Sequence, residues 1–114
     1  MSERPRNAGA WRRIRVGPSP RHGTGVFARA RIRTGARIGA FEGRPTRRDG
    51  PHVLWLVDDD GSAEGLLVEN ELRYLNHSRR PNAEIDGTDL YALRNIQPGA
   101  EILIHYGADW NDVD

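Results

Sequence analysis

Short apolar groups separated by turn residues run along the whole chain. In residues 11–43, apolar pairs alternate with the turn segments GPSP, HGTG and RTG, which predicts two or three short strands. Residues 51–61, PHVLWLVDDDG, form a β-rich apolar run that ends in an Asp-Gly turn and predict a hairpin. No long stripe with a 3.6-residue period is present, which argues against a helical bundle. The predicted fold class is therefore mostly β.

The second half of the chain contains the best candidate for a short helix, at residues 70–75. This segment leads directly into the polar loop RYLNHSRRPN at residues 73–82. Three strand-like pieces follow in residues 83–107, joined by the turns DGTD and QPGA. The 114 residues can bury one modest core, so we expect a single domain at 11–110. Residues 1–10 and 111–114 are expected to be terminal tails.

The composition excludes several classes of site. No cysteine is present, which excludes disulfides, thiolate catalysis and cysteine-based metal sites. No apolar run approaches the ~18 residues of a membrane span, and the N-terminal stretch lacks the apolar core of a signal peptide. The sequence thus predicts a soluble, cytoplasmic protein with no membrane partner, and secretion as an effector is the alternative.

The net charge of +1 hides a strong division between the two halves of the chain. Residues 1–50 contain 13 arginines and three acids, whereas residues 51–114 contain four arginines and 13 acids. The halves can neutralise each other, or the acidic half can attract a basic partner. Direct binding of nucleic acid is disfavoured, because aromatic residues do not interleave with the arginines and the net charge is nearly zero.

The polar loop at 73–82 allows three interpretations: a metal site, a nucleophile with its base, or a shaped loop that holds a ligand. The four histidines lack metal-ligand spacing, which predicts no metal site. Ser78 is the immediate neighbour of His77 and is poorly placed to be activated by it. A loop held together by the Asn76 and Asn82 side chains is the structural alternative.

Two further features carry weak signals when each is taken alone. The HGTG turn lets backbone approach a ligand closely, but, taken alone, a plain hairpin turn is the better explanation of it. Tyr106 ends the run ILIHYG and fits a core tyrosine, while Trp110 in the polar tail ADWNDVD needs a flat partner, either the protein surface or a ligand ring.

Taken in order, these signals resemble the SET domain of protein lysine methyltransferases. The resemblance rests on G-x-G, then R-Y-L-N-H-S-x-x-P-N, then G-x-E-I-x-I-x-Y-G, and covers about residues 12–110. The compact form without cysteine-rich flanking modules is similar to the minimal viral and bacterial type, which lacks pre-SET and post-SET modules. The resemblance implies several small curved sheets, a short helix and a C-terminal pseudoknot.

The family resemblance also implies an activity, the transfer of a methyl group from S-adenosylmethionine to a lysine ε-amine. Tyr106 would be the catalytic residue, and Trp110 would pack on the adenine. The implied cofactor-binding residues are Gly23, Thr24, Gly25, Val26, Arg73, Asn76, His77, Tyr106 and Trp110.

The implied substrate is a lysine-containing basic protein, such as a histone or histone-like protein, attracted by the acidic second half. Trp55, Ile85, Ile104 and Tyr106 are expected to form the substrate channel. The channel tyrosine of the family is replaced here around Val53–Trp55, so a non-catalytic SET-like module that binds a basic peptide or the cofactor is the alternative. A homodimer is expected by analogy with minimal family members.

Overall fold

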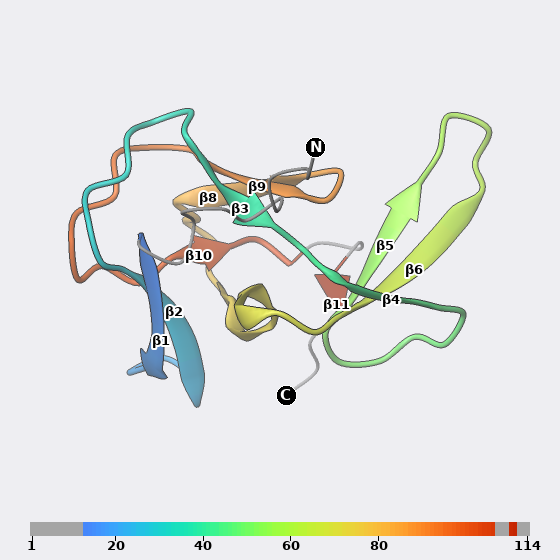
Figure 1. Cartoon of the computed structure of the whole chain (residues 1–114), viewed down its shortest axis with the longest axis horizontal. Helices are drawn as coiled ribbons and strands as arrows, with labels where there is room; N and C mark the ends of the chain where they lie inside the picture. Colours follow the sequence, from blue (N-terminus) through green and yellow to red (C-terminus); the bar gives the residue numbers. More distant parts are fainter. Residues whose placement is uncertain (1–12, 107–109, 112–114) are drawn as a thin grey trace, which may run out of the picture.

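The computed structural model describes residues 13–106 and the strand residues 110–111. These residues form short strands and one turn of 3-10 helix arranged in several small sheets (Figure 1). The elements are β1 (Ile14–Pro18), β2 (Thr24–Ala28), β3 (Arg37–Ala40), β4 (Gly43–Thr46), β5 (Val53–Val57), β6 (Ala63–Val68), η2 (Glu71–Tyr74), β7 (Asn76–His77), β8 (Ala83–Asp86), β9 (Asp89–Ala92), β10 (Leu103–Ile104) and β11 (Trp110–Asn111). The prediction of a mostly β chain is confirmed.

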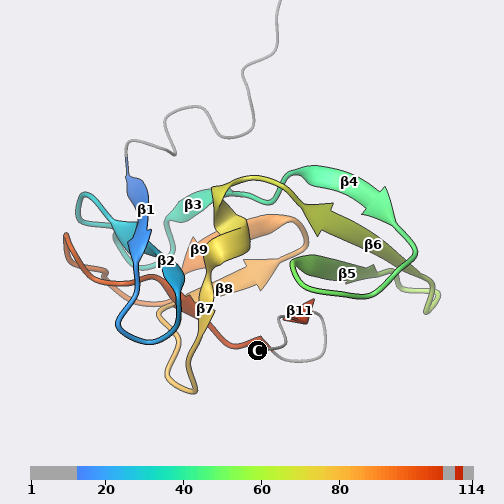
Figure 2. The ribbon, with the colours of Figure 1, turned by 90° about the horizontal axis from the view of Figure 1, so that it is seen from below.

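The described strands form four sheets. β1 pairs with β2, and the three-stranded sheet has the order β3-β9-β8. The four-stranded sheet has the order β11-β5-β6-β4, and β10 pairs with β7. Only this last pairing is parallel among the strands that the structure describes. Figure 2 shows β11 beside β5, on the far side of the molecule from the β1–β2 hairpin.

The turn residues identified in the sequence produce the hairpins. In the β5–β6 turn, the Asp58 N–H donates to the Ser62 carbonyl over 2.8 Å, and Gly61 has a φ of 87°. Such a φ suits glycine, which has no Cβ to clash. HGTG likewise forms the end of the β1–β2 hairpin, with Gly23 at a φ of 45°. The predicted hairpin at 51–61 and helix at 70–75 are both found.

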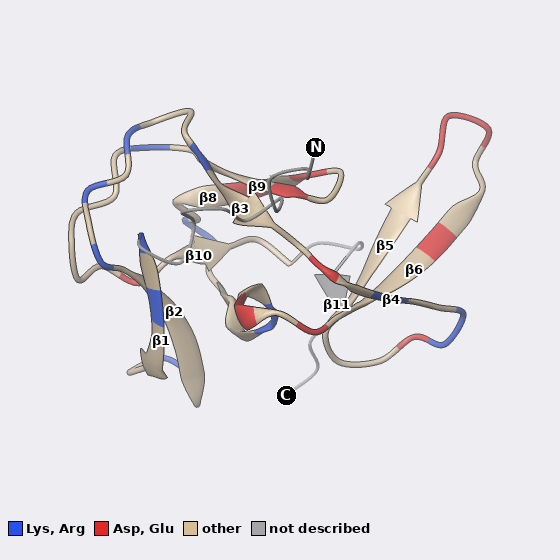
Figure 3. Ribbon diagram, in the orientation of Figure 1, with Lys and Arg blue, Asp and Glu red and all other residues tan. Residues whose placement is uncertain are grey.

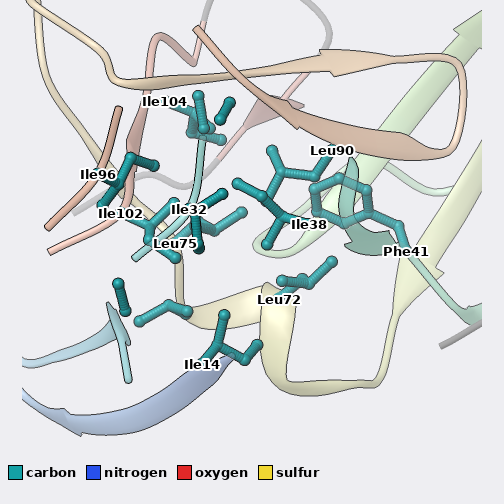
Figure 4. Packing of buried hydrophobic residues seen from close by; sticks show 14 of the residues in the cluster. Ile14, Ile32, Ile38, Phe41, Leu72, Leu75, Leu90, Ile96, Ile102 and Ile104 are labelled. Carbon is teal, nitrogen blue, oxygen red and sulfur yellow. The ribbon is translucent and has the colours of Figure 1, made fainter. Parts of the chain in front are cut away.

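The core lies where the sheets and η2 meet (Figure 4). η2 buries Leu72 and is followed by the fully buried Leu75, while β3 contributes Ile38 and β9 contributes Leu90. Because every element is too short to bury a complete face alone, the apolar side chains of distant segments complete one shared cluster.

The segment at residues 101–106 lies against the loop at 75–82. The Ser78 N–H donates to the Ile104 carbonyl over 2.9 Å, and the Leu103 N–H donates to Asn82 Oδ1 over 2.8 Å. The chain then returns to the four-stranded sheet, where Trp110 pairs with Leu54. Residues 1–10 and 112–114 of the predicted tails lie outside the described residues, whereas Asn111 belongs to β11.

Among the described residues, the helical structure is the single 3-10 turn η2. None of their helices has the length and apolar character needed to cross a bilayer.

Replacing Leu72 by alanine should strongly destabilise the fold. Leu72 is 0% exposed and links η2 to the core, so Leu72→Ala should lower the free energy of unfolding by about 2–5 kcal/mol. Urea unfolding followed by circular dichroism measures this change. Leu93→Ala is the matched control, because Leu93 is 40% exposed and should change stability by less than about 0.5 kcal/mol. Equal effects of the two substitutions would contradict this description of the core.

Candidate active site

A cavity of about 240 Å³ lies between the HGTG turn and the segment at 73–76. Its walls combine backbone of a glycine turn, a guanidinium group and aromatic rings. The lining residues are His22, Gly23, Thr24, His52, Arg73, Tyr74 and Asn76. Two segments about 50 residues apart in sequence, each of them weak evidence alone, therefore form one site.

The Asn76 side chain fixes the shape of this cavity. Its Nδ2 group donates to the carbonyls of His22 over 3.0 Å and Thr24 over 3.1 Å, and to Glu101 Oε2 over 2.9 Å. Asn76 is only 3% exposed. A buried amide that lost these partners would carry a desolvation cost of about 1–3 kcal/mol. Asn76 thus joins the turn, the loop and the closing segment at one point.

Glu101 completes this junction from the opposite side. Both of its carboxylate oxygens lie 2.9 Å from Ser19 Oγ. A Cβ at residue 25 would collide with this carboxylate and approach Ser19 Cβ, so a larger residue there would displace Glu101 from its contacts with Ser19 and Asn76. Gly25 is therefore required by internal packing, whereas open space lies around Gly23.

Arg73 forms the edge of the cavity with a guanidinium group that is already held in place. It donates to the carbonyls of Glu69 over 2.6 Å and Asn70 over 2.9 Å, and to the Tyr74 hydroxyl over 2.7 Å. Its Cζ also lies 4.3 Å from the centre of the Tyr74 ring. These contacts fix both side chains without enclosing either of them completely.

A groove of about 740 Å³ lies between the β5 end of the four-stranded sheet and the β8–β9 hairpin. Apolar side chains form much of its wall, and two acids lie at its edge. The lining residues are Leu54, Trp55, Leu56, Val57, Asp58, Pro81, Ala83, Glu84, Ile85, Gly87, Thr88, Leu93, His105 and Tyr106. Three of the predicted channel residues, Trp55, Ile85 and Tyr106, are brought together here.

Tyr106 connects the groove with the cavity. It lines the groove, and its hydroxyl donates over 2.9 Å to the carbonyl of Leu75. The neighbours of Leu75 on both sides, Tyr74 and Asn76, line the cavity. The phenol therefore extends from the groove to the backbone segment that bounds the cavity.

The His77 imidazole holds the backbone of Tyr106. The Tyr106 N–H donates to His77 Nδ1 over 3.0 Å, and the His105 ring packs edge-on at 4.8 Å between ring centres. Desolvation, followed by the nearby His105 and Arg79, lowers the pKa of His77. This direction agrees with the hydrogen bond, because Nδ1 can accept the Tyr106 N–H only while it carries no proton.

Several predicted site residues lie elsewhere. Val26 is 0% exposed and belongs to the core. Ile104 is only 1% exposed and does not line the groove. His77 is exposed and contacts Tyr106 instead of lining the cavity. The side chain of Trp110, predicted to pack on the adenine, lies outside what the structure describes, although its backbone pairs with β5.

The sequence interpretation missed His22, His52 and Tyr74 in the cavity and His105 in the groove. His22 and Tyr74 had a usable signal, because His22 lies within HGTG and Tyr74 within RYLNHSRRPN, the segments already singled out. His52 had none, since the chain brings it to the cavity from the start of the β5–β6 hairpin. Within the described residues, no group of three or more His, Asp or Glu side chains is arranged to hold a metal ion.

Comparison with known proteins identifies the family. The model of the SET domain matches residues 23–107, most of the chain, and this match includes the glycine turn, the polar loop and Tyr106. The chain therefore belongs to the SET-domain family, whose fold is the one described above.

Individual relatives agree with this assignment. The histone-lysine N-methyltransferase MEDEA of Arabidopsis thaliana is 27% identical over an alignment that covers 88% of this chain and 18% of that protein. The chain thus spans about a fifth of the length of this relative. A crystal structure of a candidate histone methyltransferase from Plasmodium falciparum is 26% identical, with a TM-score of 0.68, and covers 86% of this chain and 96% of that one.

Two structures of lower identity share the fold. The methyltransferase domain of the human histone-lysine N-methyltransferase SETMAR superposes with a TM-score of 0.69 at 19% identity, covering 82% of this chain and 44% of that one. A Polycomb Repressive Complex 2 from Chaetomium thermophilum, bound to S-adenosylmethionine, gives a TM-score of 0.73 at 20% identity, over 87% of this chain and 16% of that one.

The His77 contact predicts a pH dependence of stability. Because the folded pKa is lowered, the unfolded state takes up a proton first as the pH falls below the ordinary value of about 6.5. The contribution of His77 is therefore complete above this value and is lost as the pH falls toward the folded pKa. His77→Asn offers an amide oxygen in place of Nδ1 and does not titrate, so it should remove this part of the pH dependence.

Urea unfolding at pH values from 5.5 to 8.5 measures the difference between the wild type and His77→Asn. The control His22→Asn removes a histidine for which no such contact to Tyr106 exists, and it should keep the wild-type profile. Parallel profiles for the wild type and His77→Asn would show that the contact does not respond to pH.

Proposed function

We propose that this chain is a protein-lysine N-methyltransferase that uses S-adenosylmethionine and acts on a basic protein. The observation that carries this proposal is the hydrogen bond between the Tyr106 hydroxyl and the Leu75 carbonyl. It lies at the boundary between a cavity suited to a cofactor and a groove suited to a side chain. Membership of the SET family, with histone-lysine methyltransferases among the relatives, supports the same activity.

The cavity residues fit the chemical groups of S-adenosylmethionine. Gly23 leaves open space in which the cofactor can approach the backbone closely. Arg73 supplies positive charge for the carboxylate of the cofactor, and the Tyr74 ring offers an apolar face for its adenine. The volume of 240 Å³ is slightly below the ~300–1,000 Å³ of typical small-molecule sites, so the cavity would enclose part of the cofactor. When bound, the cofactor supplies an electrophilic methyl group on a sulfonium.

The groove is suited to deliver an uncharged amine. A reference lysine has a pKa of ~10.4 and is mostly ammonium at neutral pH. The apolar wall around Leu54, Trp55 and Ile85 disfavours the charged form and therefore favours the amine that can attack a methyl group. A narrow approach also restricts the orientation of the amine, and proximity and orientation can supply ~7–11 kcal/mol in favourable cases.

Tyr106 would orient that amine at the end of the groove. Its hydroxyl is held by Leu75, and its backbone is held by His77, so the phenol is fixed from two sides. A fixed phenol can accept a hydrogen bond from the amine through its oxygen while its own O–H continues to donate to the Leu75 carbonyl. No protein nucleophile is needed for this chemistry.

The acids at the edge of the groove favour a basic substrate. Asp58 and Glu84 line it, and Asp59 and Asp60 continue the acidic β5–β6 turn. Such a surface attracts segments rich in lysine and arginine and speeds their association at low salt. We therefore propose a histone or histone-like protein as the substrate class.

Methyl transfer can be tested directly. The purified chain is incubated with methyl-labelled S-adenosylmethionine and a panel of lysine-rich proteins, including histones, and the labelled residue is identified by mass spectrometry. Label on a lysine ε-amine is the expected result. Binding of the cofactor without label on any panel member would instead favour the non-catalytic SET-like module.

Substituting Tyr106 by phenylalanine should reduce turnover by on the order of 10²-fold, because the amine loses its positioning oxygen. The fold should persist, since a lost neutral hydrogen bond costs only about 1 kcal/mol. Rates with labelled cofactor are compared with cofactor affinity by calorimetry, which should stay close to the wild-type value. Tyr91→Phe is the matched control, because Tyr91 lies outside both the cavity and the groove. A wild-type rate for Tyr106→Phe would refute the role of this tyrosine.

A further inference from the structure

Four exposed arginines gather at the end of the molecule away from the acidic β5–β6 turn. They are Arg29, Arg31, Arg33 and Arg94, and they are called here the basic end. Three lie in the connection between β2 and β3, and the fourth follows β9. Figure 3 shows these connections on one side of the molecule and the acidic β5–β6 turn on the opposite side. Part of the charge division seen in the sequence is therefore also a division in space, although Arg44, Arg47 and Arg48 lie at the other end.

The two connections form a fixed frame for these arginines. Ile32 and Ile96 exchange both backbone hydrogen bonds, over 2.9 and 2.8 Å, and both side chains are buried at 2%. Asn95 Oδ1 also accepts the Thr34 N–H over 2.9 Å. Successive residues of extended chain point to opposite faces, so the buried Ile32 directs Arg31 and Arg33 outward.

Nothing within the described protein neutralises the basic end. Its guanidinium groups make no ion pair or side-chain hydrogen bond with any described residue. Other arginines of the first half are paired across the halves: Arg37 lies 3.0 Å from Asp89, and Arg44 lies 3.0 Å from Glu69. The segments 28–41 and 90–100 contain no acid at all.

We propose that the basic end binds the phosphate backbone of duplex nucleic acid. Arginine suits this role, because its planar fork matches phosphate oxygens and it stays charged at all relevant pH values. The near-zero net charge argued against such binding, but it is the sum over a basic and an acidic surface. It therefore does not describe the local charge of the basic end. A duplex is favoured over a single strand because segments 28–37 and 92–99 contain no aromatic residue on which bases could stack.

The position of the basic end connects this surface with the groove. Arg94 directly follows Leu93, which lines the groove and is 40% exposed. In a complex of a basic protein with nucleic acid, the phosphates of the nucleic acid would contact the basic end. The lysine-rich segment of the basic protein would then lie close to the groove. This connection rests on the proposed function, whereas the binding of nucleic acid itself does not.

Fluorescence anisotropy with a labelled 25-base-pair duplex tests the proposal. Four phosphate contacts predict a slope of about −3.6 for log K against log salt, which is roughly a 10²-fold loss of affinity between 50 and 200 mM salt. The triple variant Arg31→Gln, Arg33→Gln and Arg94→Gln should reduce that slope by about 2.7. Its thermal melting should stay close to the wild-type value, because all three side chains are exposed and have no partner among the described residues.

A second triple variant is the matched control. Arg44→Gln, Arg47→Gln and Arg48→Gln removes the same charge from the other end of the molecule, near β4, and should keep the wild-type slope. Equal losses in both triple variants would show that net charge alone drives binding and would overturn the proposal. Tighter binding of a single strand of the same sequence would also overturn it.

Light scattering at low salt tests whether a second copy of the chain, instead of a duplex, binds to the basic end. If the wild type forms dimers that the first triple variant abolishes, while neither binds the duplex, the basic end contacts the acidic turn of a second copy and the proposal is wrong. The duplex assay contains no S-adenosylmethionine or peptide. Its outcome is therefore independent of whether the chain transfers methyl groups.

Discussion

The structure depends on one buried amide. Asn76 ties the glycine turn, the polar loop and the closing segment together through three acceptors, and Glu101 is in turn held by Ser19. The shared apolar core holds the small sheets together, and this point of contact adds directional hydrogen bonds that fix the turn, the loop and the closing segment relative to one another. An amide suits this junction better than a charged group, because it carries no net charge and so avoids the much larger desolvation cost of burying an unpaired ion.

The junction also explains why the two halves of the site remain in register. The cavity is built from the segments that Asn76 joins. The groove ends at Tyr106, which lies five residues after Glu101 in the sequence. The side chains that hold this region serve as positioning groups, and the tyrosine is the group exposed to the groove. The end of the groove that Tyr106 lines is therefore fixed, whereas the acidic β5–β6 turn is exposed.

Local chemistry explains which parts could be predicted from the sequence. The hairpins were predictable because Asp-Gly and Gly-x-Gly turns act over a few residues, and Tyr106 was identified from a motif. The role of Glu101 was not predictable, because its partner Ser19 lies 82 residues away. The resemblance to the family placed Ile104 in the channel, two residues before Tyr106. β10 ends at Ile104, so the alternation of side chains does not continue to Tyr106, and the isoleucine faces the core.

The parallel pairing of β7 with β10 has a consequence for how the protein folds. It joins residues 76–77 to residues 103–104, and no turn links them directly. The antiparallel hairpins are local and can form within microseconds, whereas this contact must wait for closure of a long loop. Tyr106 reaches the groove only after that closure. The site therefore depends on contacts between segments that are distant in sequence, as do the pairings of β3 with β9 and of β5 with β11, and it forms more slowly than the local hairpins.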